Sequence, residues 1–189
     1  MSYEQLAMNF PGIPYRGVSF LSPAVVFVTP WIVPVKRLIL SGKTGSWCTL
    51  PYPGHPKGCP NYGKKPSCPP NAPPVRERFD LARPLYLVHS GFDLAAHAAA
   101  MKEKHSGWSD RQCRCLLYWQ PKSRKQLRER VLRAAAITGA REMTDCPEAM
   151  GVNVFATAAV SGLKLDRTRS ISICRHVALL GFRRGKENR

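Results

Sequence analysis

The sequence predicts one domain of the α/β or α+β class over residues 1–189, and three observations favour this class. Short apolar runs of strand length alternate with stretches of helical period in residues 84–182. Residues 43–74 are rich in cysteine, proline and glycine and show no periodicity. Hydrophobic residues make up 44% of the chain, which is ordinary for a protein with a core. We therefore expect a layered core formed by residues 84–182, with a long cysteine-rich loop inserted near one end.

The N-terminal part, residues 1–34, is expected to form an irregular arm with one or two short strands. Within it begins an apolar stretch, residues 18–35, that is about long enough to cross a bilayer. This stretch is interrupted by Pro23, Pro30 and Pro34. Because proline breaks a helix, buried strands and turns are the better interpretation, and no membrane partner is expected. Residues 35–40 then predict a strand that ends at Ser41 and Gly42.

Strand and helix patterns follow one another after the cysteine-rich loop. Residues 84–89 form a short apolar run that predicts a buried strand. Asp93 can cap a helix over residues 94–104, because its side chain can accept a hydrogen bond from a free backbone N–H. Residues 113–119 predict a second strand.

A basic amphipathic helix is predicted from Pro121 to about Thr138, with Gly139 as its end. Its apolar side is formed by Leu127, Val131, Ala134 and Ala135. Its opposite side carries Lys122, Arg124, Lys125, Arg128, Arg130 and Arg133. Such a helix would pack one side on the core and present the other to solvent or to an anionic partner.

Two further elements complete the predicted order. A helix is expected to begin near Asp145, because Glu148 follows at the spacing of a capping box. Residues 176–182 predict a last strand, followed by a basic tail over residues 183–189.

The chain is strongly basic, with 29 Lys and Arg against 12 Asp and Glu and a net charge of +17. Such a surface attracts polyanions, of which nucleic acid is the commonest. The basic side of the predicted helix over residues 121–138 can lie along a phosphate backbone. We expect nucleic acid or a phosphorylated substrate to contact Lys122, Arg124, Lys125 and Arg128. An acidic protein partner and a merely solvated basic surface are the alternatives.

Three cysteines in the loop carry the most specific signal of the sequence. Cys48, Cys59 and Cys68 stand in a segment whose prolines fix the backbone and whose glycines allow tight turns. A soft metal ion or an iron–sulfur cluster is the natural occupant of a point where such thiols meet. Metal binding would also supply order to a loop that is unusually long for a compact domain.

The fourth ligand is less clear from the sequence. Its candidates are Cys113, Cys115, Cys146 and Cys174, with His55 as a more distant possibility. Cys146 is our first choice because a proline follows it, as after Cys59 and Cys68, and because a helix N-terminus favours a thiolate. The other three candidates are more typical of core thiols. A site with only three cysteines and one open position is the alternative.

The spacing of the loop cysteines favours an iron–sulfur cluster, for example of the 4Fe–4S type, over zinc. Structural zinc sites commonly use pairs of cysteines two to four residues apart. The loop contains no such pair, since its cysteines stand at 48, 59 and 68. Zinc stays the alternative metal.

The segment from Cys48 to Pro70 resembles the signature of a widespread family of predicted metal-binding proteins of unknown function. That family shares a cysteine, then a Gly-Cys-Pro-x-Tyr-Gly element, here beginning at Gly58, then a Cys-Pro-Pro element, here beginning at Cys68. A looser similarity covers residues 147–154. The resemblance implies metal binding through Cys48, Cys59 and Cys68, and it implies no particular reaction.

The expected function combines these signals. The sequence holds seven cysteines, and residues 1–10 show no basic segment leading into an apolar one, so we expect a cytoplasmic protein whose clustered thiols bind metal. Redox or sulfur chemistry in nucleic-acid modification is the expected role. A non-enzymatic nucleic-acid-binding module, in which zinc or a cluster only orders the loop, is the alternative. No catalytic residue can be assigned from the sequence.

Overall fold

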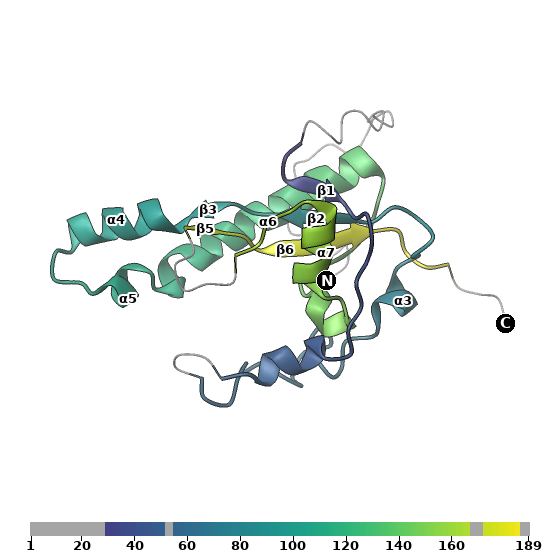
Figure 1. Ribbon diagram of the computed structural model, residues 1–189, viewed down its shortest axis with the longest axis horizontal. Helices are drawn as coiled ribbons and strands as arrows, with labels where there is room; N and C mark the ends of the chain where they lie inside the picture. The colour runs from purple at the N-terminus through teal and green to yellow at the C-terminus, as the bar shows by residue number, and fades with distance from the viewer. Residues whose placement is uncertain (1–28, 52–54, 167–171, 186–189) are drawn as a thin grey trace.

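The protein is a mixed α and β structure built around one antiparallel sheet (Figure 1). The computed structural model describes residues 29–51, 55–166 and 172–185. Within these residues, a four-stranded sheet has the strand order β1-β2-β6-β4, and all of its pairings are antiparallel. The mixed class expected from the sequence is therefore confirmed, in its α+β form.

The sheet is formed by short strands from distant parts of the chain. They are β1 (Ile32–Pro34), β2 (Tyr86–His89), β6 (Val177–Gly181) and β4 (Glu142–Thr144). Pro34 is tolerated because β1 lies at the edge of the sheet, where a missing backbone N–H breaks no interior ladder. β6 lies in the interior of the sheet and pairs with β2 on one side and β4 on the other.

Each side of the sheet is covered by a different helix, because side chains of a strand alternate between its faces. On one face, Val88, Ala178 and Leu180 pack against the long helix α6 (Leu116–Thr138). On the other, Leu87 and Leu179 pack in a cluster that includes residues of α7 (Val154–Ser161). The result is three layers, with the sheet between α6 and α7 (Figure 1).

A narrow extension projects from one end of the sheet. It holds a two-stranded ribbon of β3 (Phe92–Asp93) and β5 (Ile173–Cys174). Beyond the ribbon lie α4 (Leu94–Lys104) and the short helix α5 (Asp110–Cys113), at the left of Figure 1. The first part of α6 runs along the same extension, so this helix joins the extension to the layered core.

Three further short helices lie around the cysteine-rich segment and the second core cluster. They are η1 (Thr44–Thr49), α3 (Val75–Arg78) and η2 (Pro147–Met150). The predicted loop over residues 43–74 therefore begins with a 3-10 helix and is otherwise made of turns in its described part. The hydrophobic core also begins earlier than the predicted range of 84–182, since Ile32, Val75 and Phe79 belong to it.

Several predicted elements are confirmed. The strand predicted over residues 84–89 is β2, and that over residues 176–182 contains β6. α4 begins at Leu94, and the Asp93 side chain accepts a 2.8 Å hydrogen bond from the backbone N–H of Ala96. α6 ends before Gly139, which has the left-handed φ of 73° that glycine adopts without strain.

The strand predicted over residues 35–40 is wrong. Pairing takes place one segment earlier, at β1, and of these residues only Leu40 forms an isolated bridge, to Val152. Lys36 and Arg37 are exposed, and the chain bends there. The apolar pattern of residues 35–40 reflects side chains such as Val35 and Leu38 that pack against the core without joining the sheet.

The strand predicted over residues 113–119 is also wrong, because this segment is helical. Ser109 and Gln112 form a capping box that begins α5, and α6 begins directly afterwards at Leu116. Pro121, predicted to open the helix, lies inside α6 instead. Adjacent apolar residues at 116–118 suggested a strand, but all of them are exposed, which a buried strand does not allow.

The helix predicted near Asp145 is replaced by two shorter elements. η2 follows Cys146 without any side-chain cap, so Glu148 does not complete a capping box. The regular helix of this region is α7, and its cap is the Asn153 side chain, which accepts a 3.0 Å hydrogen bond from the backbone N–H of Ala156.

Most of the arm predicted over residues 1–34 lies outside the described residues, including most of its apolar stretch. Within the described ranges, no helix combines the length and apolar character needed to span a bilayer.

Candidate metal centre

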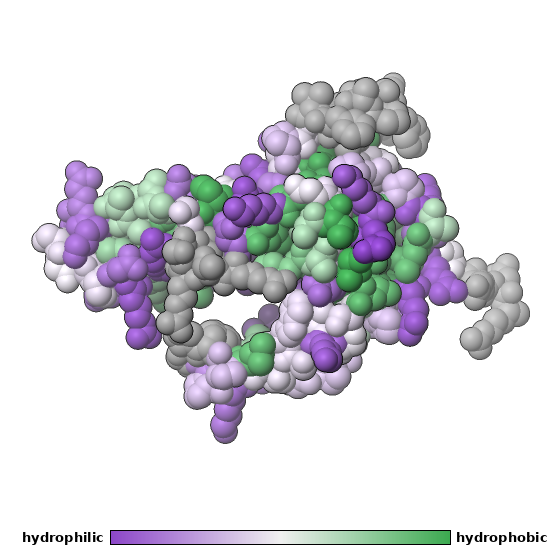
Figure 2. Space-filling view, viewed as in Figure 1, coloured by the Kyte–Doolittle hydropathy of each residue, from purple (hydrophilic) through white to green (hydrophobic). Residues whose placement is uncertain are grey.

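A cavity of about 460 Å³ lies between the cysteine-rich segment, α6 and the segment from β5 to β6. Figure 2 shows the surface hollowed between the body that carries α4 and α6 and the cysteine-bearing segment at the lower edge. The three loop cysteines and our first choice of fourth ligand all line this cavity: Cys48, Cys59, Cys68 and Cys146. Residues almost a hundred positions apart in the sequence therefore face one space.

The backbone of Cys59 is tied directly to that of Cys48. The Cys59 N–H donates a 2.7 Å hydrogen bond to the Cys48 carbonyl oxygen. Gly58 makes this approach possible, because it has a left-handed φ of +81° and lies against the chain of the first cysteine. A Cβ at position 58 would lie 2.7 Å from the Thr49 Cα and would also collide with the Cys48 carbonyl oxygen. Only glycine fits there.

Cys68 is positioned by turns that return to the Cys59 segment. Its N–H donates to the Lys65 carbonyl oxygen at 3.0 Å, and its own carbonyl accepts from the Ala72 N–H at 2.9 Å. The Gly63 N–H donates to the Pro69 carbonyl oxygen at 2.9 Å, which joins the turn after Cys59 to the residue after Cys68. The loop thus gains its order from backbone hydrogen bonds and needs few apolar contacts.

Cys146 reaches the same cavity because η2 is docked on η1. Thr44, at the start of η1, is fully buried, and its hydroxyl lies 2.8 Å from the Glu148 carbonyl oxygen, to which it donates. The ring of Trp47 in η1 also lies 6.3 Å from that of Phe155 in α7, the helix that follows η2. The Cys146 N–H donates to the Thr144 hydroxyl at 3.2 Å. These contacts hold the segments of Cys48 and Cys146 side by side.

Burial and neighbouring groups oppose ionisation of two of these thiols. Burial raises the pKa of Cys48, and the nearby thiols of Cys59 and Cys68 raise it further. Burial, with a contribution from Glu148, raises the pKa of Cys146 to about 12. Burial at Cys146 therefore outweighs the helix N-terminus that was expected to favour a thiolate there. η2 has only four residues, and its effect is smaller than the cost of burying a charge.

The remaining ligand candidates separate clearly. Cys113 is 1% exposed on α5 and belongs to the core, as expected, and neither it nor Cys115 lines the cavity. Cys174 was expected in the core but is partly exposed and lines the cavity. Cys146 interacts electrostatically with Cys48, whereas the interaction found for Cys174 is with Arg175. Cys146 is therefore the better placed of the two.

The thiols of Cys48, Cys59, Cys68 and Cys146 share one cavity, but their side chains are not arranged around a single point. Among the described residues, which include all seven cysteines, no group of three or more His, Cys, Asp or Glu side chains is placed to hold a metal ion. All seven cysteines are free of disulfides.

Cationic side chains line the other side of the cavity. Arg124 and Arg128 of α6 do so, together with Arg175, which follows β5. Lys122 and Lys125, the other residues predicted to contact nucleic acid, are exposed and lie outside the cavity lining. The structure thus divides the predicted basic side of α6 into a pair that faces the cysteines and a pair that does not. Sequence reasoning missed Arg175, which no motif marks.

His176 also lines the cavity and is held by two serines. Its Nδ1 lies 2.9 Å from the Ser123 hydroxyl, and that hydroxyl lies 2.9 Å from the hydroxyl of Ser90. Burial lowers the pKa of His176, and the neighbouring Arg124 lowers it further, while Asp145 opposes this. The ring is therefore biased toward its neutral form. Sequence reasoning placed His176 at the start of a strand and gave it no role.

Comparison of the chain with protein-family models, with curated proteins and with solved structures found no match. The resemblance of residues 48–70 to a predicted metal-binding family therefore stays an expectation, and the function has to be argued from the cavity itself.

Proposed function

We propose that this protein binds a metal centre, an iron–sulfur cluster in preference to zinc, through Cys48, Cys59, Cys68 and Cys146. The observation that carries the proposal is that all four cysteines line one cavity although they come from separate segments of the chain. Thiolate sulfur is the ligand that iron–sulfur clusters and zinc share, and four cysteines complete either site. The donor set therefore fits in type and in number.

Binding would require the side chains to turn toward one another and to lose their protons. The described residues hold no ready-made group of metal ligands, and burial raises the pKa of both Cys48 and Cys146. A cation in the cavity would reverse that effect, since a bound metal ion stabilises the thiolate. Because thiols must stay reduced to act as ligands, the proposal places the protein in the cytoplasm.

The basic surface supports a nucleic acid or a nucleotide-like molecule as the partner. The net charge is +17, and Arg124 and Arg128 face the same cavity as the cysteines. A cluster beside such a partner would serve redox or sulfur chemistry in nucleic-acid modification. The cavity volume of about 460 Å³ favours this enzymatic role, because it lies within the size range of small-molecule sites.

A non-enzymatic nucleic-acid-binding module is the second candidate function. It is favoured by the number of cysteines, because four thiolates would close the coordination of zinc or of a cluster and leave no open position for a substrate. An enzymatic centre that binds its substrate at the metal would instead use Cys48, Cys59 and Cys68 and leave the fourth position to an exchangeable ligand.

Anaerobic purification, followed by iron, sulfide and zinc analysis and a visible absorption spectrum, tests the metal proposal. We expect iron and inorganic sulfide in the wild-type protein and a large loss of both in Cys59→Ser and Cys146→Ser. Cys115→Ser is the matched control, because Cys115 is partly exposed and lies outside the cavity lining. Stoichiometric zinc in a colourless protein would support the second candidate, and absence of any metal after reconstitution would refute both.

A further inference from the structure

Three arginines of the cavity have no carboxylate partner in the described part of the chain. Its ion pairs join Arg78 to Glu142 and Arg114 to Asp110. Neither pair uses Arg124, Arg128 or Arg175, although acidic side chains also line the cavity. Like charges that share a cavity and form no ion pair repel one another, and an anion placed among them would relieve this repulsion.

The side chain of Arg175 adds a second, independent observation. Its Nε is buried, and it is one of only two buried side-chain nitrogens or oxygens without a hydrogen-bond partner in the described residues. A buried donor is normally paired with protein or with a bound molecule. Since Arg175 lines the cavity, an acceptor atom of a ligand there can supply the missing partner.

The serine chain behind His176 offers a further donor. The Ser90 hydroxyl accepts a 2.9 Å hydrogen bond from the His176 backbone N–H, so its own proton is available for the Ser123 hydroxyl at 2.9 Å. The alternative acceptor, the His176 carbonyl oxygen, is farther away at 3.5 Å. Ser123 then donates to Nδ1 of the imidazole at 2.9 Å. In the neutral ring the proton consequently stays on Nε2, where it can be donated to a ligand.

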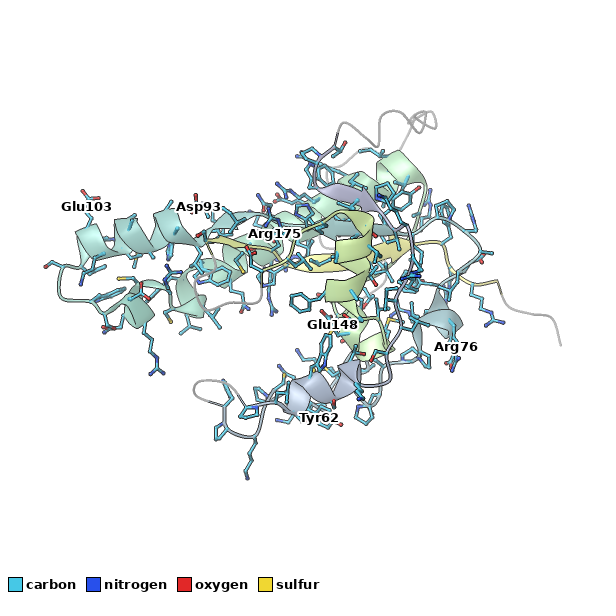
Figure 3. All side chains as sticks on the ribbon, viewed as in Figure 1. Tyr62, Arg76, Asp93, Glu103, Glu148 and Arg175 are labelled. Carbon is cyan, nitrogen blue, oxygen red and sulfur yellow. The ribbon has the colours of Figure 1, made fainter. Side chains whose placement is uncertain are left out.

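Three acidic residues line the cavity, Asp145, Glu148 and Asp166, and the first two lie toward the thiols. Glu148 and Asp145 both interact electrostatically with Cys146. Figure 3 shows Glu148 at the η2 end and Arg175 across from it, beside the β5 to β6 segment. The cavity therefore has one side with thiols and carboxylates and another side with guanidinium groups. Asp145 lies near both sides, because it interacts electrostatically with His176 as well as with Cys146.

We propose that Arg124, Arg128, Arg175 and the Nε2–H of His176 form a phosphate-binding subsite, so that the molecule that reaches the cysteines carries a phosphate group. This inference rests on the proposed function, because it takes the nucleic acid or nucleotide-like partner proposed above and places its phosphate group in the cavity that the cysteines line. Three guanidinium groups supply more donors than one carboxylate accepts, whereas a phosphate has oxygens for all of them.

The probes are adenosine 5′-monophosphate and adenosine, which differ only by the phosphate group. Calorimetry should show that the nucleotide binds at least about tenfold more tightly than the nucleoside, as expected for charge-assisted hydrogen bonds. The double variant Arg124→Gln/Arg128→Gln should remove about tenfold or more of the nucleotide affinity. Arg175→Lys, which keeps the charge but loses Nε, should also weaken binding.

The matched control is Lys122→Gln/Lys125→Gln on the same helix. It removes the same number of charges from residues that do not line the cavity, so it should change nucleotide affinity no more than about twofold. Equal losses in the two double variants would overturn the subsite, as would equal affinity for nucleotide and nucleoside.

Oligonucleotides distinguish the two sources of the phosphate. Tight binding of a short 5′-phosphorylated strand, with weaker binding of the same strand bearing a 5′-hydroxyl, would identify a nucleic-acid end as the ligand. A preference for the mononucleotide over both strands would identify a free nucleotide. Either result supports the subsite, and binding of both strands with no effect of Arg128→Gln would count against it.

The subsite and the metal centre can fail separately. Nucleotide binding is measured in the wild-type protein as purified and in Cys59→Ser, with the metal content of each sample determined in parallel. Retained binding in a protein that never holds metal would preserve the subsite and refute the metal proposal. Metal content without nucleotide binding would preserve the metal proposal and refute the subsite.

Discussion

At the scale of single residues, Gly58 has the most demanding position near the candidate site. It combines a left-handed φ with a backbone contact to Cys48 and Thr49 that leaves no room for a Cβ. This close contact of the two backbone segments brings Cys59 beside Cys48. The Gly58-Cys59 pair can be recognised in the sequence as part of a motif. The steric collision that a Cβ at position 58 would cause can be recognised only from the structure.

We expect Gly58→Ala to destabilise the protein by about 2–4 kcal/mol, the sum of left-handed strain and steric overlap. Two glycines serve as controls. Gly63→Ala has the strain without the overlap, since its φ is +71° and nothing lies within 4 Å of a Cβ there. Gly42→Ala has neither. Urea unfolding should rank the three variants in that order, and a Gly58→Ala protein as stable as Gly42→Ala would contradict the argument.

His89 makes a specific pH dependence expected. Burial lowers its pKa, and the nearby Arg175 and Arg130 act in the same direction, against hydrogen bonds to two carbonyl oxygens that favour the charged form. The unfolded chain therefore binds a proton below about pH 6.5, where folded His89 is still neutral. Its stabilising contribution is complete above that pH and is lost as the pH falls.

Unfolding free energies of wild type and His89→Gln, measured between about pH 7 and about pH 5, check this expectation. Wild type should lose up to about 1.4 kcal/mol more per pH unit than the variant. His176 and Glu148, whose pKa values are also shifted, are present in both proteins and cancel in the difference. Parallel curves for the two proteins would show that His89 titrates alike in the folded and unfolded states.

At the scale of elements, the docking of η1 on η2 decides whether the cysteines meet. The buried Thr44 hydroxyl makes the direct link, to the Glu148 carbonyl oxygen. Thr44→Val keeps the shape but leaves the Glu148 carbonyl oxygen with one hydrogen bond, from the Gly151 N–H at 3.2 Å. Loss of the Thr44 hydrogen bond should cost about 0.5–1.5 kcal/mol and lower the metal content. Thr49→Val is the control, because its exposed hydroxyl donates only within η1, to the Ser46 carbonyl oxygen. Metal analysis and thermal unfolding of both variants provide the measurement.

Helices and strands could be predicted from the sequence where short-range signals determine where they begin and end. Asp93 as a cap, the apolar side of α6 and its end at Gly139 follow from short-range rules, and all are confirmed. The two failures have different causes. Residues 113–119 were assigned to a strand from an apolar run, although the Ser109–Gln112 capping box just before them is a local helix signal. The helix near Asp145 was assigned from a capping pattern, but tertiary contacts decide which of two compatible conformations forms there.

The candidate site was predictable only in part for the same reason. Cys48, Cys59 and Cys68 are recognisable by type and spacing, and the following proline singled out Cys146. Arg175 and His176 follow a strand of only two residues and carry no pattern. Their place beside α6 results from the pairing of β3 with β5, which lie about eighty positions apart in the chain.

At the scale of the whole molecule, we expect the core to form without the candidate metal centre. The two apolar clusters cover opposite faces of the sheet and contain none of the cysteines that line the cavity. Removal of metal by a chelator should therefore lower the melting temperature, by about 2–4 °C for each kcal/mol of lost stability, without abolishing cooperative unfolding. Circular dichroism of the metal-free protein checks this, and a metal-free chain without a cooperative transition would show that the centre is part of the core.

The position of β6 inside the sheet also has a consequence for synthesis on the ribosome. β2 and β4 do not pair with each other, and both depend on a strand, residues 177–181, that is translated long after either of them. Until that strand emerges from the exit tunnel, the central ladder cannot form. The cysteine segment is exposed to oxidants and to competing metals throughout this interval, so the order of translation makes the thiols most vulnerable before the fold that shelters them is complete.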